Sequence, residues 1–470
     1  MSDTAESAFT AFRAAERLKP RSQPPWEVYG ERLRRYEVHL NGPRVEMLRA
    51  PVELEGYGLR VFRRAEEKMG VGFAASTDLR DAGVEAALAA AEGAAQYARF
   101  PARRVELPGT AGGPADVAIV DRGLWDRPVE SVERFVATLL APFEGRAHEQ
   151  PSFGSVRATL VETTLANSEG IQRRYHHTML EVEIAVKATG GPEGAPPGEY
   201  WVNQRHRQVP SDATVRTEAE RWIRLAQDVR RAKGPETGAT KVVLPTSVLS
   251  DILPAIVGFR MSGSARLRKM MPPMGSQVGA PEVTIVDDGL IPHAIGTAPF
   301  DDEGVGQSRR PLVEAGVATG SIYDLLHASA LGEPTGGNGR RDSALFPAWF
   351  RFAQSPVPGP TTLSVKPGRG GTDAELAEIA GDGLWVDQLG YAFPDPLSGA
   401  FGGEIRSAYR IRGGKIAEPV RGGTVGGVVF AAPGEASLLH SVAAIGRSTE
   451  LVGGLLSPNW LVDGMTVAGA

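Results

Sequence analysis

The most informative stretch of this sequence is Pro299-Phe300-Asp301-Asp302-Glu303-Gly304-Val305, with Arg309 and Arg310 a few residues further on. Its three consecutive carboxylates could act as a general acid and base. Neighbouring side chains diverge in an extended chain, however, and the two arginines are close enough in sequence to pair with the carboxylates as ions. The spacing therefore favours a structural network or a solvated loop, and acid–base chemistry at Asp301, Asp302 or Glu303 stays open as an alternative.

A second polar cluster follows about 30 residues later. It reads Glu333-Pro334-Thr335-Gly336-Gly337-Asn338-Gly339-Arg340-Arg341. Its glycines permit positive φ angles and a close approach of other groups to the backbone. Such a loop can cradle a peptide backbone or another subunit, and an ordinary surface turn fits the pattern equally well.

The composition is that of a globular protein, with 42% apolar residues, 23% charged residues and a net charge of −5 over 470 residues. At about 100 to 200 residues per domain, this length predicts two or three domains. The absence of cysteine excludes disulfide scaffolds, thiolate zinc sites, iron–sulfur clusters and cysteine nucleophiles. Acidic and basic residues are interleaved, so the charge pattern does not predict nucleic-acid binding.

Targeting signals are not evident. The first residues, Met1 to Glu6, have neither the basic region nor the apolar core of a secretion signal. No apolar run approaches the roughly 18 residues that a membrane span needs. We therefore expect a cytoplasmic protein that does not enter a membrane.

The first half of the chain mixes helical and strand patterns. A short helix is expected within the first 20 residues, and a hairpin where Asn41-Gly42 separates two alternating runs. Leu180, Val182, Ile184 and Val186 fall on one face of a predicted strand. The other expected elements are strands at 58–62 and 156–165 and helices at 77–97, 129–143 and 214–233.

Glycine- and proline-rich breaks at 190–198 and 234–238 suggest where the chain divides. We predict an amino-terminal domain at 1–237 with β-hairpins flanked by helices, and a β-rich carboxyl-terminal domain at 238–470 with one long helix at 246–268. Shorter helices are expected at 322–331 and 372–380, the latter with the capping-box pair Thr372 and Glu375. Strands and helices come in runs, so the predicted fold class is α+β.

Metal and nucleotide signatures are weak. The eight histidines include no His-Glu-x-x-His pair, and His176-His177 lies in a strand, where adjacent side chains point to opposite faces. The glycines from Gly56 onward lie in a strand pattern, and those before Thr372 lack the Gly-Lys-Ser/Thr of a phosphate loop. A nucleophile elbow of the Gly-x-Ser-x-Gly type is also absent.

Taken in order, the two polar clusters and their surroundings resemble the TldD/PmbA family, also called TldD/TldE or modulator of DNA gyrase. The matching segments cover most of the chain. They are 58–62, 70–74, 167–170, 300–305, 312–317, 323–331, 335–340, 381–386, 390–391, 398–402 and 461–469.

The resemblance carries an implication about zinc. The family's TldD subunit has a His-Glu-x-x-x-His motif on a helix of its carboxyl-terminal domain and a further cysteine ligand, whereas the TldE (PmbA) subunit lacks the motif. The corresponding helix here is 246–268, which places Pro254 and Phe259 at the histidine positions and Ala255 at the glutamate position. None of these side chains can bind zinc, so no catalytic residue, metal or cofactor is expected in this chain.

The resemblance therefore implies a TldE/PmbA-like subunit whose TldD-like partner carries the zinc, acting on unfolded peptides. Whether the chain is itself an enzyme stays open, and the alternative is a stand-alone homodimer that binds peptides without cleaving them. The residues expected at the peptide cavity or the subunit contact come from the two polar clusters. They are Asp301, Asp302, Glu303, Arg309, Arg310, Thr335, Gly336, Asn338 and Arg340.

Overall fold

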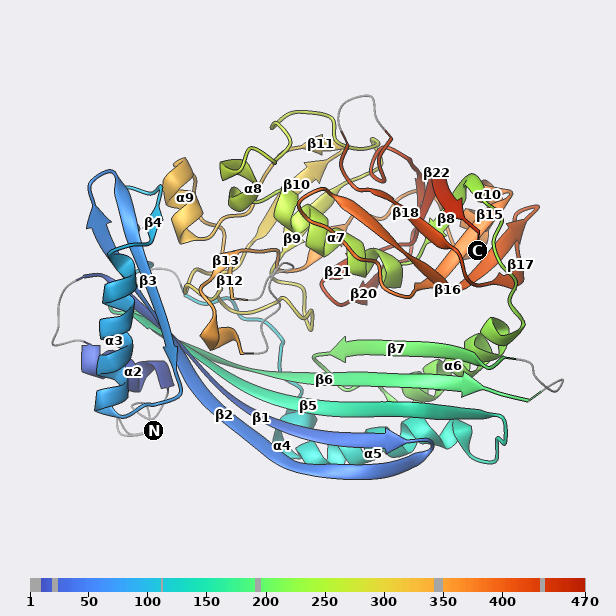
Figure 1. The fold of residues 1–470 in the computed structure, drawn as a ribbon, viewed down its shortest axis with the longest axis horizontal. Helices are drawn as coiled ribbons and strands as arrows, with labels where there is room; N and C mark the ends of the chain where they lie inside the picture. Colours follow the sequence, from blue (N-terminus) through green and yellow to red (C-terminus); the bar gives the residue numbers. More distant parts are fainter. Residues whose placement is uncertain are drawn as a thin grey trace.

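A computed structural model describes residues 10–18, 24–110, 113–190, 196–341, 350–431 and 436–469. Parts of the expected first helix and of the 190–198 loop lie outside these ranges. Figure 1 shows the first half of the chain as one long curved sheet, with the second half lying over one face of it. The second half is rich in strands, and the α+β fold class is confirmed.

The first sheet is antiparallel, with the strand order β4-β3-β2-β1-β5-β6-β7. Its strands are β1 (Trp26–Asn41), β2 (Arg44–Ala65), β3 (Lys68–Ser76), β4 (Arg99–Phe100), β5 (Glu149–Asn167), β6 (Gln172–Ala188) and β7 (Gly198–His206). The helices of this half are α2 (Thr10–Leu18), α3 (Asp81–Ala95), α4 (Arg122–Asp126), α5 (Pro128–Leu140) and α6 (Asp212–Arg231), with a 3₁₀ turn, η1 (Ala141–Phe143).

The expected hairpin is present, but its second strand is longer than predicted. Residues 58–62 are not a separate strand, because β2 pairs with β1 almost without interruption from Arg44 to Val61. Pro51, which cannot donate a ladder hydrogen bond, lies at a register shift where β2 has no second neighbour, since β3 pairs only with 57–65. Edges and bulges are where a strand tolerates proline.

The two faces of this sheet differ in character. Leu180, Val182, Ile184 and Val186 are all buried in one apolar cluster with residues of α5 and α6, which confirms the predicted face. The opposite face carries charged residues in register across β1, β5, β6 and β7. They are Glu37, Arg157, Glu181 and Arg205. The second half of the chain contacts this polar face. Glu31 and Tyr175, which lie on it by alternation, meet the backbone N–H of Arg351 (3.2 Å) and the ring of Phe300 (centroids 5.1 Å apart).

The second half contains two larger sheets and one small one. The six-stranded sheet has the order β11-β10-β9-β14-β21-β20. In the seven-stranded sheet, β15 pairs with both β8 and β16. These pairings close a ring of five strands, β8-β22-β18-β16-β15. The strands are β8 (Gly238–Leu244), β9 (Ile285–Asp288), β10 (Arg309–Glu314), β11 (Val317–Ala318), β12 (Gly339–Arg340), β13 (Val357–Pro358), β14 (Leu363–Val365), β15 (Gly383–Leu389), β16 (Ala400–Arg412), β17 (Lys415–Val420), β18 (Thr424–Val428), β19 (Val442–Ile445), β20 (Glu450–Val452), β21 (Leu455–Ser457) and β22 (Trp460–Ala468).

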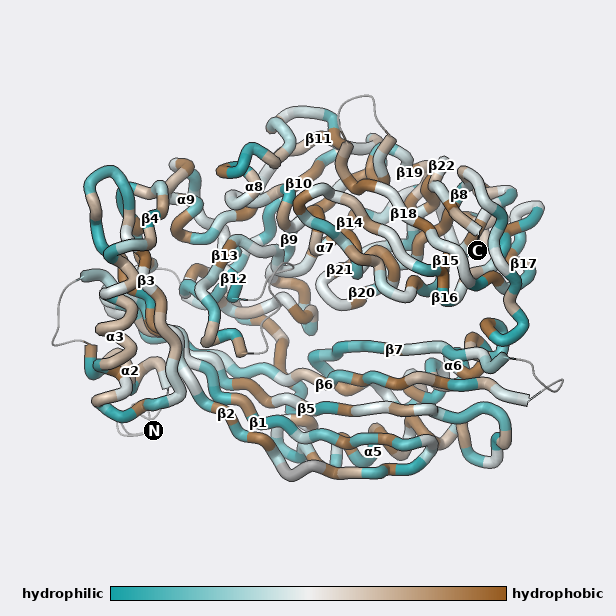
Figure 2. Tube along the Cα trace, in the orientation of Figure 1, coloured by the Kyte–Doolittle hydropathy of each residue, from teal (hydrophilic) through white to brown (hydrophobic). Residues whose placement is uncertain are grey.

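The helices of the second half are α7 (Thr246–Arg260), α8 (Gly263–Leu267), α9 (Leu325–Leu331) and α10 (Asp373–Ala380), with a 3₁₀ turn, η2 (Arg351–Ala353). Helix α7 is apolar nearly all round and lies in the largest apolar cluster of the chain, where hydrophobic segments gather in Figure 2. The predicted capping box of Thr372 and Glu375 at α10 is confirmed.

The single helix expected at 246–268 is wrong, because the chain forms two helices there. The backbone N–H of Gly263 donates to the carbonyl of Ile322 at 2.9 Å, and the N–H of Ile322 donates to the carbonyl of Met261 at 2.9 Å. These bonds hold Met261 and Ser262 out of helical geometry, and the Ser262 side chain caps α8 by accepting the N–H of Ala265. The same bridge delays the start of α9 to Leu325.

None of the helices in the described ranges combines the length and the apolar character that a membrane crossing requires.

Candidate functional site

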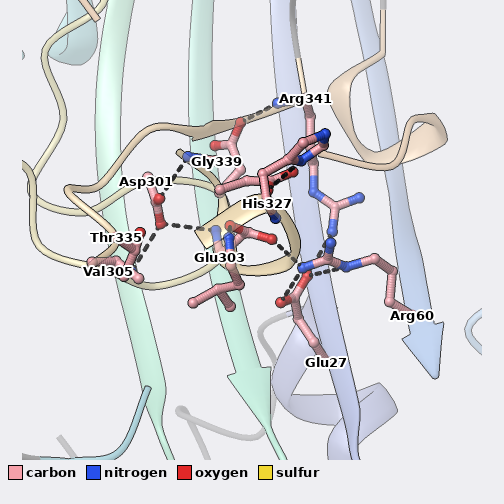
Figure 3. A network of polar contacts seen from close by, with 12 residues as sticks. Glu27, Arg60, Asp301, Glu303, Val305, His327, Thr335, Gly339 and Arg341 are labelled. Atoms are coloured by element: carbon pink, nitrogen blue, oxygen red, sulfur yellow. Dashed lines mark hydrogen bonds and ion pairs between the residues drawn. The ribbon is translucent and has the colours of Figure 1, made fainter. Parts of the chain in front are cut away.

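The first polar cluster forms a tight turn that is bound to the second cluster. One carboxylate oxygen of Asp301 accepts the backbone N–H groups of Glu303 (3.0 Å) and Val305 (2.8 Å). Its other oxygen accepts the N–H of Gly339 at 2.8 Å, and Gly339 in turn accepts from the backbone of Asp302 at 3.0 Å. Figure 3 shows these contacts converging on Asp301. A side chain at position 339 would collide with the Glu303 carboxylate, which explains the glycine there.

This turn is joined to the first sheet by a buried ion network, which we call the junction network and define as Glu27, Arg60, Glu303 and Arg341. The Arg60 guanidinium donates to Glu303 at 2.6 Å and to both oxygens of Glu27 at 3.1 and 2.8 Å. Arg341 donates to Glu27 at 3.0 Å (Figure 3). All four side chains are 0% exposed. Two of them come from β1 and β2 and two from the second half, so these charges join the two halves.

The neighbouring carboxylate, Asp302, has its own partners in the second half. It contacts the Arg351 guanidinium and accepts the backbone N–H of Arg341 at 2.7 Å. Arg351 also donates its backbone N–H to Glu31 of β1 at 3.2 Å. The sequence suggested a network or a solvated loop, and the structure has the network.

The arginines expected to pair with these carboxylates do not do so. Arg309 is exposed and lies 3.8 Å from Asp288, and Arg310 donates to the carbonyl of Ser321 at 3.1 Å. Both belong to β10, whose pairing with β9 carries them away from the turn. The arginines that replace them, Arg60 and Arg351, are far from the cluster in sequence, and local spacing contains no signal for them.

Burial opposes the ionised form of all three acids, and the neighbouring arginines oppose this effect of burial at Asp302 and Glu303. Burial raises the pKa of Asp301 to about 7 and the pKa of Glu303 well above its usual range. Burial is also the largest single influence on Asp302 and opposes its ionised form, but Arg351, Arg340 and Arg341 together outweigh it and lower the pKa of Asp302. Asp301, Asp302 and Glu303 are at most 1% exposed, so none offers an oxygen to solvent. This arrangement holds the fold together and leaves no room for a substrate to exchange a proton with these acids.

The other candidate residues of the second cluster lie around the same junction. Thr335 donates to the carbonyl of Tyr323 at 3.4 Å, and the carbonyl of Gly336 accepts from Ser308 at 3.0 Å. Asn338 is buried and donates to Asp287 at 2.6 Å. Arg340 donates to the carbonyl of Gly296 at 3.2 Å.

His327 makes side-chain contacts with Asp324 and Ser264 that the sequence did not indicate. Its Nδ1 lies 2.7 Å from Asp324 Oδ1, and its Nε2 lies 3.2 Å from the hydroxyl of Ser264. The same oxygen accepts the backbone N–H of His327 at 2.7 Å, so Asp324 is the N-cap of α9. Phe100 packs edge-on against the imidazole, with ring centroids 4.8 Å apart. The contacts therefore describe a capped and packed histidine.

Helix α7 carries the positions at which the family resemblance placed a zinc motif. Pro254 and Ala255 are half-buried and Phe259 is buried, and none has a side-chain nitrogen or oxygen. Pro254 faces the turn between β20 and β21, because a Cβ built on Gly454 would lie 3.8 Å from its ring. The described residues contain no group of three His, Asp or Glu placed to hold a metal. This helix does not fit a zinc ion.

The geometry defines a class of protein: a two-part α+β chain with a long antiparallel sheet, a β-rich second half around a buried helix, and a charged junction between the halves. The family described as PmbA/TldA metallopeptidase C-terminal domain matches residues 237–469. The solved structure of TldE from Thermococcus kodakarensis superposes with a TM-score of 0.79 over 97% of this chain and 100% of its own, at 18% identity. The chain belongs to the TldD/PmbA family.

Two relatives are similar in sequence. A metalloprotease TldD homologue of Haemophilus influenzae is 29% identical over 252 residues, which are 52% of this chain and 50% of its own length. An uncharacterized protein of Methanocaldococcus jannaschii is 27% identical over 314 residues, 66% of this chain and 68% of its own. The chain thus spans about half the length of the TldD homologue that it matches.

Replacing Arg60 should destabilise the fold strongly. Arg60→Met leaves the Glu27 and Glu303 carboxylates buried without their shared cation, and breaking a buried ion pair in this way costs about 3 to 5 kcal/mol. Urea unfolding measures the change in the free energy of unfolding. Arg63→Met, on an exposed position of the same strand, is the control and should change it by less than about 0.5 kcal/mol. Equal effects of the two substitutions would contradict the role given to Arg60.

Asp287 should make stability depend on pH in a predictable direction. Burial raises its pKa from 3.8 to about 6, although Asn338 and Thr361 donate to it. A folded-state pKa above the unfolded one stabilises the fold below the unfolded pKa, and this contribution is lost as pH rises through about 6. Relative to Asp287→Asn, the wild type should therefore lose about 2 kcal/mol of unfolding free energy between about pH 4.5 and about pH 7. Urea titrations at several pH values test this, and a flat difference or one of opposite slope would refute it.

Proposed function

We propose that this chain is a TldE/PmbA-like subunit of a two-subunit metallopeptidase, in which a TldD-like partner supplies the zinc. The observation that carries the proposal is the composition of α7. The helix lies in the apolar core, and the family resemblance assigns Pro254, Ala255 and Phe259 to the positions of the two histidines and the glutamate of the TldD motif. The chain belongs to a family of metallopeptidases, yet these positions of α7 have no atoms that could bind a metal. This combination fits a supporting subunit better than an independent hydrolase.

The fold similarity to TldE supports the same assignment. The superposition with the Thermococcus kodakarensis protein extends over 97% of this chain. The junction network adds a physical reason. It fixes the sheet and the β-rich half in one arrangement, which suits a chain that contributes a wall to a cavity instead of the reacting groups.

The proposed substrates are unfolded peptides. Strand β7 ends the sheet order, so one of its edges has no strand neighbour among the described residues. An unpaired edge can accept an extended peptide through backbone hydrogen bonds, independently of most of the peptide's side chains. Trp201, on the polar face of β7, is 38% exposed and offers an aromatic contact beside that edge.

The test is reconstitution. The chain should co-purify with a TldD-like subunit carrying His-Glu-x-x-x-His, and hydrolysis of an unfolded peptide should require both proteins. The control is the same complex with the motif glutamate of the TldD-like subunit replaced by glutamine. It should assemble and be inactive.

Elemental analysis of the isolated chain completes this test. The expected zinc content is far below one ion per chain, because α7 offers no ligand. Failure to form a complex, together with no effect on hydrolysis, would leave the homodimeric peptide-binding protein as the better assignment. Zinc near one ion per chain would contradict the subunit role itself.

A further inference from the structure

One backbone acceptor at the free edge of β7 is already occupied by a side chain of the second half. This edge, which has no strand neighbour among the described residues, is turned towards the second half of the chain (Figure 1). The side-chain amide of Gln388, in β15, donates to the carbonyl of Trp201 in β7. A side-chain N–H in this place replaces the backbone N–H that a neighbouring strand would supply.

The neighbour of Trp201 in β6 shows which way the backbone of β7 points. Trp201 lies opposite Ala185, whose carbonyl accepts the Ser152 hydroxyl of β5 at 3.3 Å. The backbone groups of Ala185 are therefore directed to β5, and its pair with Trp201 is of the kind that exchanges no hydrogen bonds. Because backbone direction alternates along a strand, Trp201, Asn203 and Arg205 all turn their N–H and C=O groups to the free edge.

The edge beyond Trp201 is open at Asn203 and Arg205. No backbone hydrogen bond outside the sheet reaches either residue from the described part of the chain. Both side chains are exposed, on the polar face of β7. Each residue offers one backbone donor and one acceptor, so an extended peptide can pair with both of them.

A β-bulge in β15 directs Gln388 towards β7. The pairing of β15 with β16 shifts in register between Val386 and Gln388, which leaves Asp387 without a cross-strand partner. Adjacent side chains of a regular strand point to opposite faces, whereas a bulge can re-aim them. Here both residues contact the same end of β7, because the buried Asp387 accepts the hydroxyl of Tyr200 at 2.9 Å while Gln388 donates to Trp201.

We propose that Gln388 is the stop residue of a peptide-binding edge. An extended peptide pairs with Asn203 and Arg205 and ends where the Gln388 amide holds the carbonyl of Trp201. This inference rests on the proposed function for the use of β7 as the peptide site. Because only every second residue of β7 faces the edge, the open part pairs with a segment of about four peptide residues. Gln388 therefore determines the length of the bound segment and not its side chains.

The experiment uses the isolated full-length chain and unstructured peptides of increasing length, acetylated and amidated at their ends. Calorimetry measures the affinity of each peptide. For the wild type, the affinity should rise up to about four residues and then stay constant. For Gln388→Ala, it should rise over about two further residues, because the pair at Trp201 becomes available. A peptide of about six residues should bind this variant about fivefold or more tightly than the wild type, as expected from two additional hydrogen bonds.

Two controls and a second measurement locate the effect. Gln96→Ala, at the exposed C-cap of α3, should show the length dependence of the wild type. Methylation of alternate peptide nitrogens removes the donors from one side of the peptide and should abolish binding to both proteins. Hydrogen exchange of the Trp201 amide should slow on addition of the longer peptide to Gln388→Ala and stay unchanged in the wild type.

An affinity of the wild type that keeps rising beyond about four residues would overturn the role of Gln388, as would the same length dependence in the wild type and Gln388→Ala. Either result would leave β7 as the peptide site. If none of the peptides bound to either protein, both the stop and the use of β7 in the proposed function would be overturned. Because neither a partner nor hydrolysis is involved, these outcomes are independent of whether a TldD-like subunit assembles with the chain.

Discussion

The relative position of the two halves of this protein depends on the ion pairs of the Arg60 guanidinium. This guanidinium reaches carboxylates of both halves, Glu27 on β1 and Glu303 in the turn, and is 0% exposed. A buried ion pair of this kind adds little net stability compared with apolar packing, but it is costly to separate. In this protein it favours one position of the β-rich half over the sheet, because any other position leaves charges buried without partners.

Several other features depend on that position. The face of the sheet that meets the second half is polar, and it carries Glu27 and Arg60 of the junction network at one end and Arg205 at the other. The junction network therefore fixes how the two halves of the chain lie relative to one another.

Much of the fold could be predicted from the sequence because periodicity is local. The apolar face of β6 and the capping box at Thr372 were both visible as short-range patterns. Short-range patterns did not indicate the continuation of β2 through Pro51 or the break after α7, because each depends on pairing with another segment. The candidate carboxylates were found, but their arginine partners were not: Arg60 and Glu303 are 243 residues apart.

The central claim is that charges contributed by both halves act on one another across the junction. The most direct measurement is a double-mutant cycle between Arg60 and Glu303, using Arg60→Met, Glu303→Gln and the double variant, with the unfolding free energy of each determined in urea. If the two side chains form one buried interaction, the change in unfolding free energy of the double variant will differ from the sum of the two single changes by about 2 kcal/mol or more. Additive effects, within about 0.5 kcal/mol, would show that the two groups are not coupled and would contradict this account of how the halves are held together.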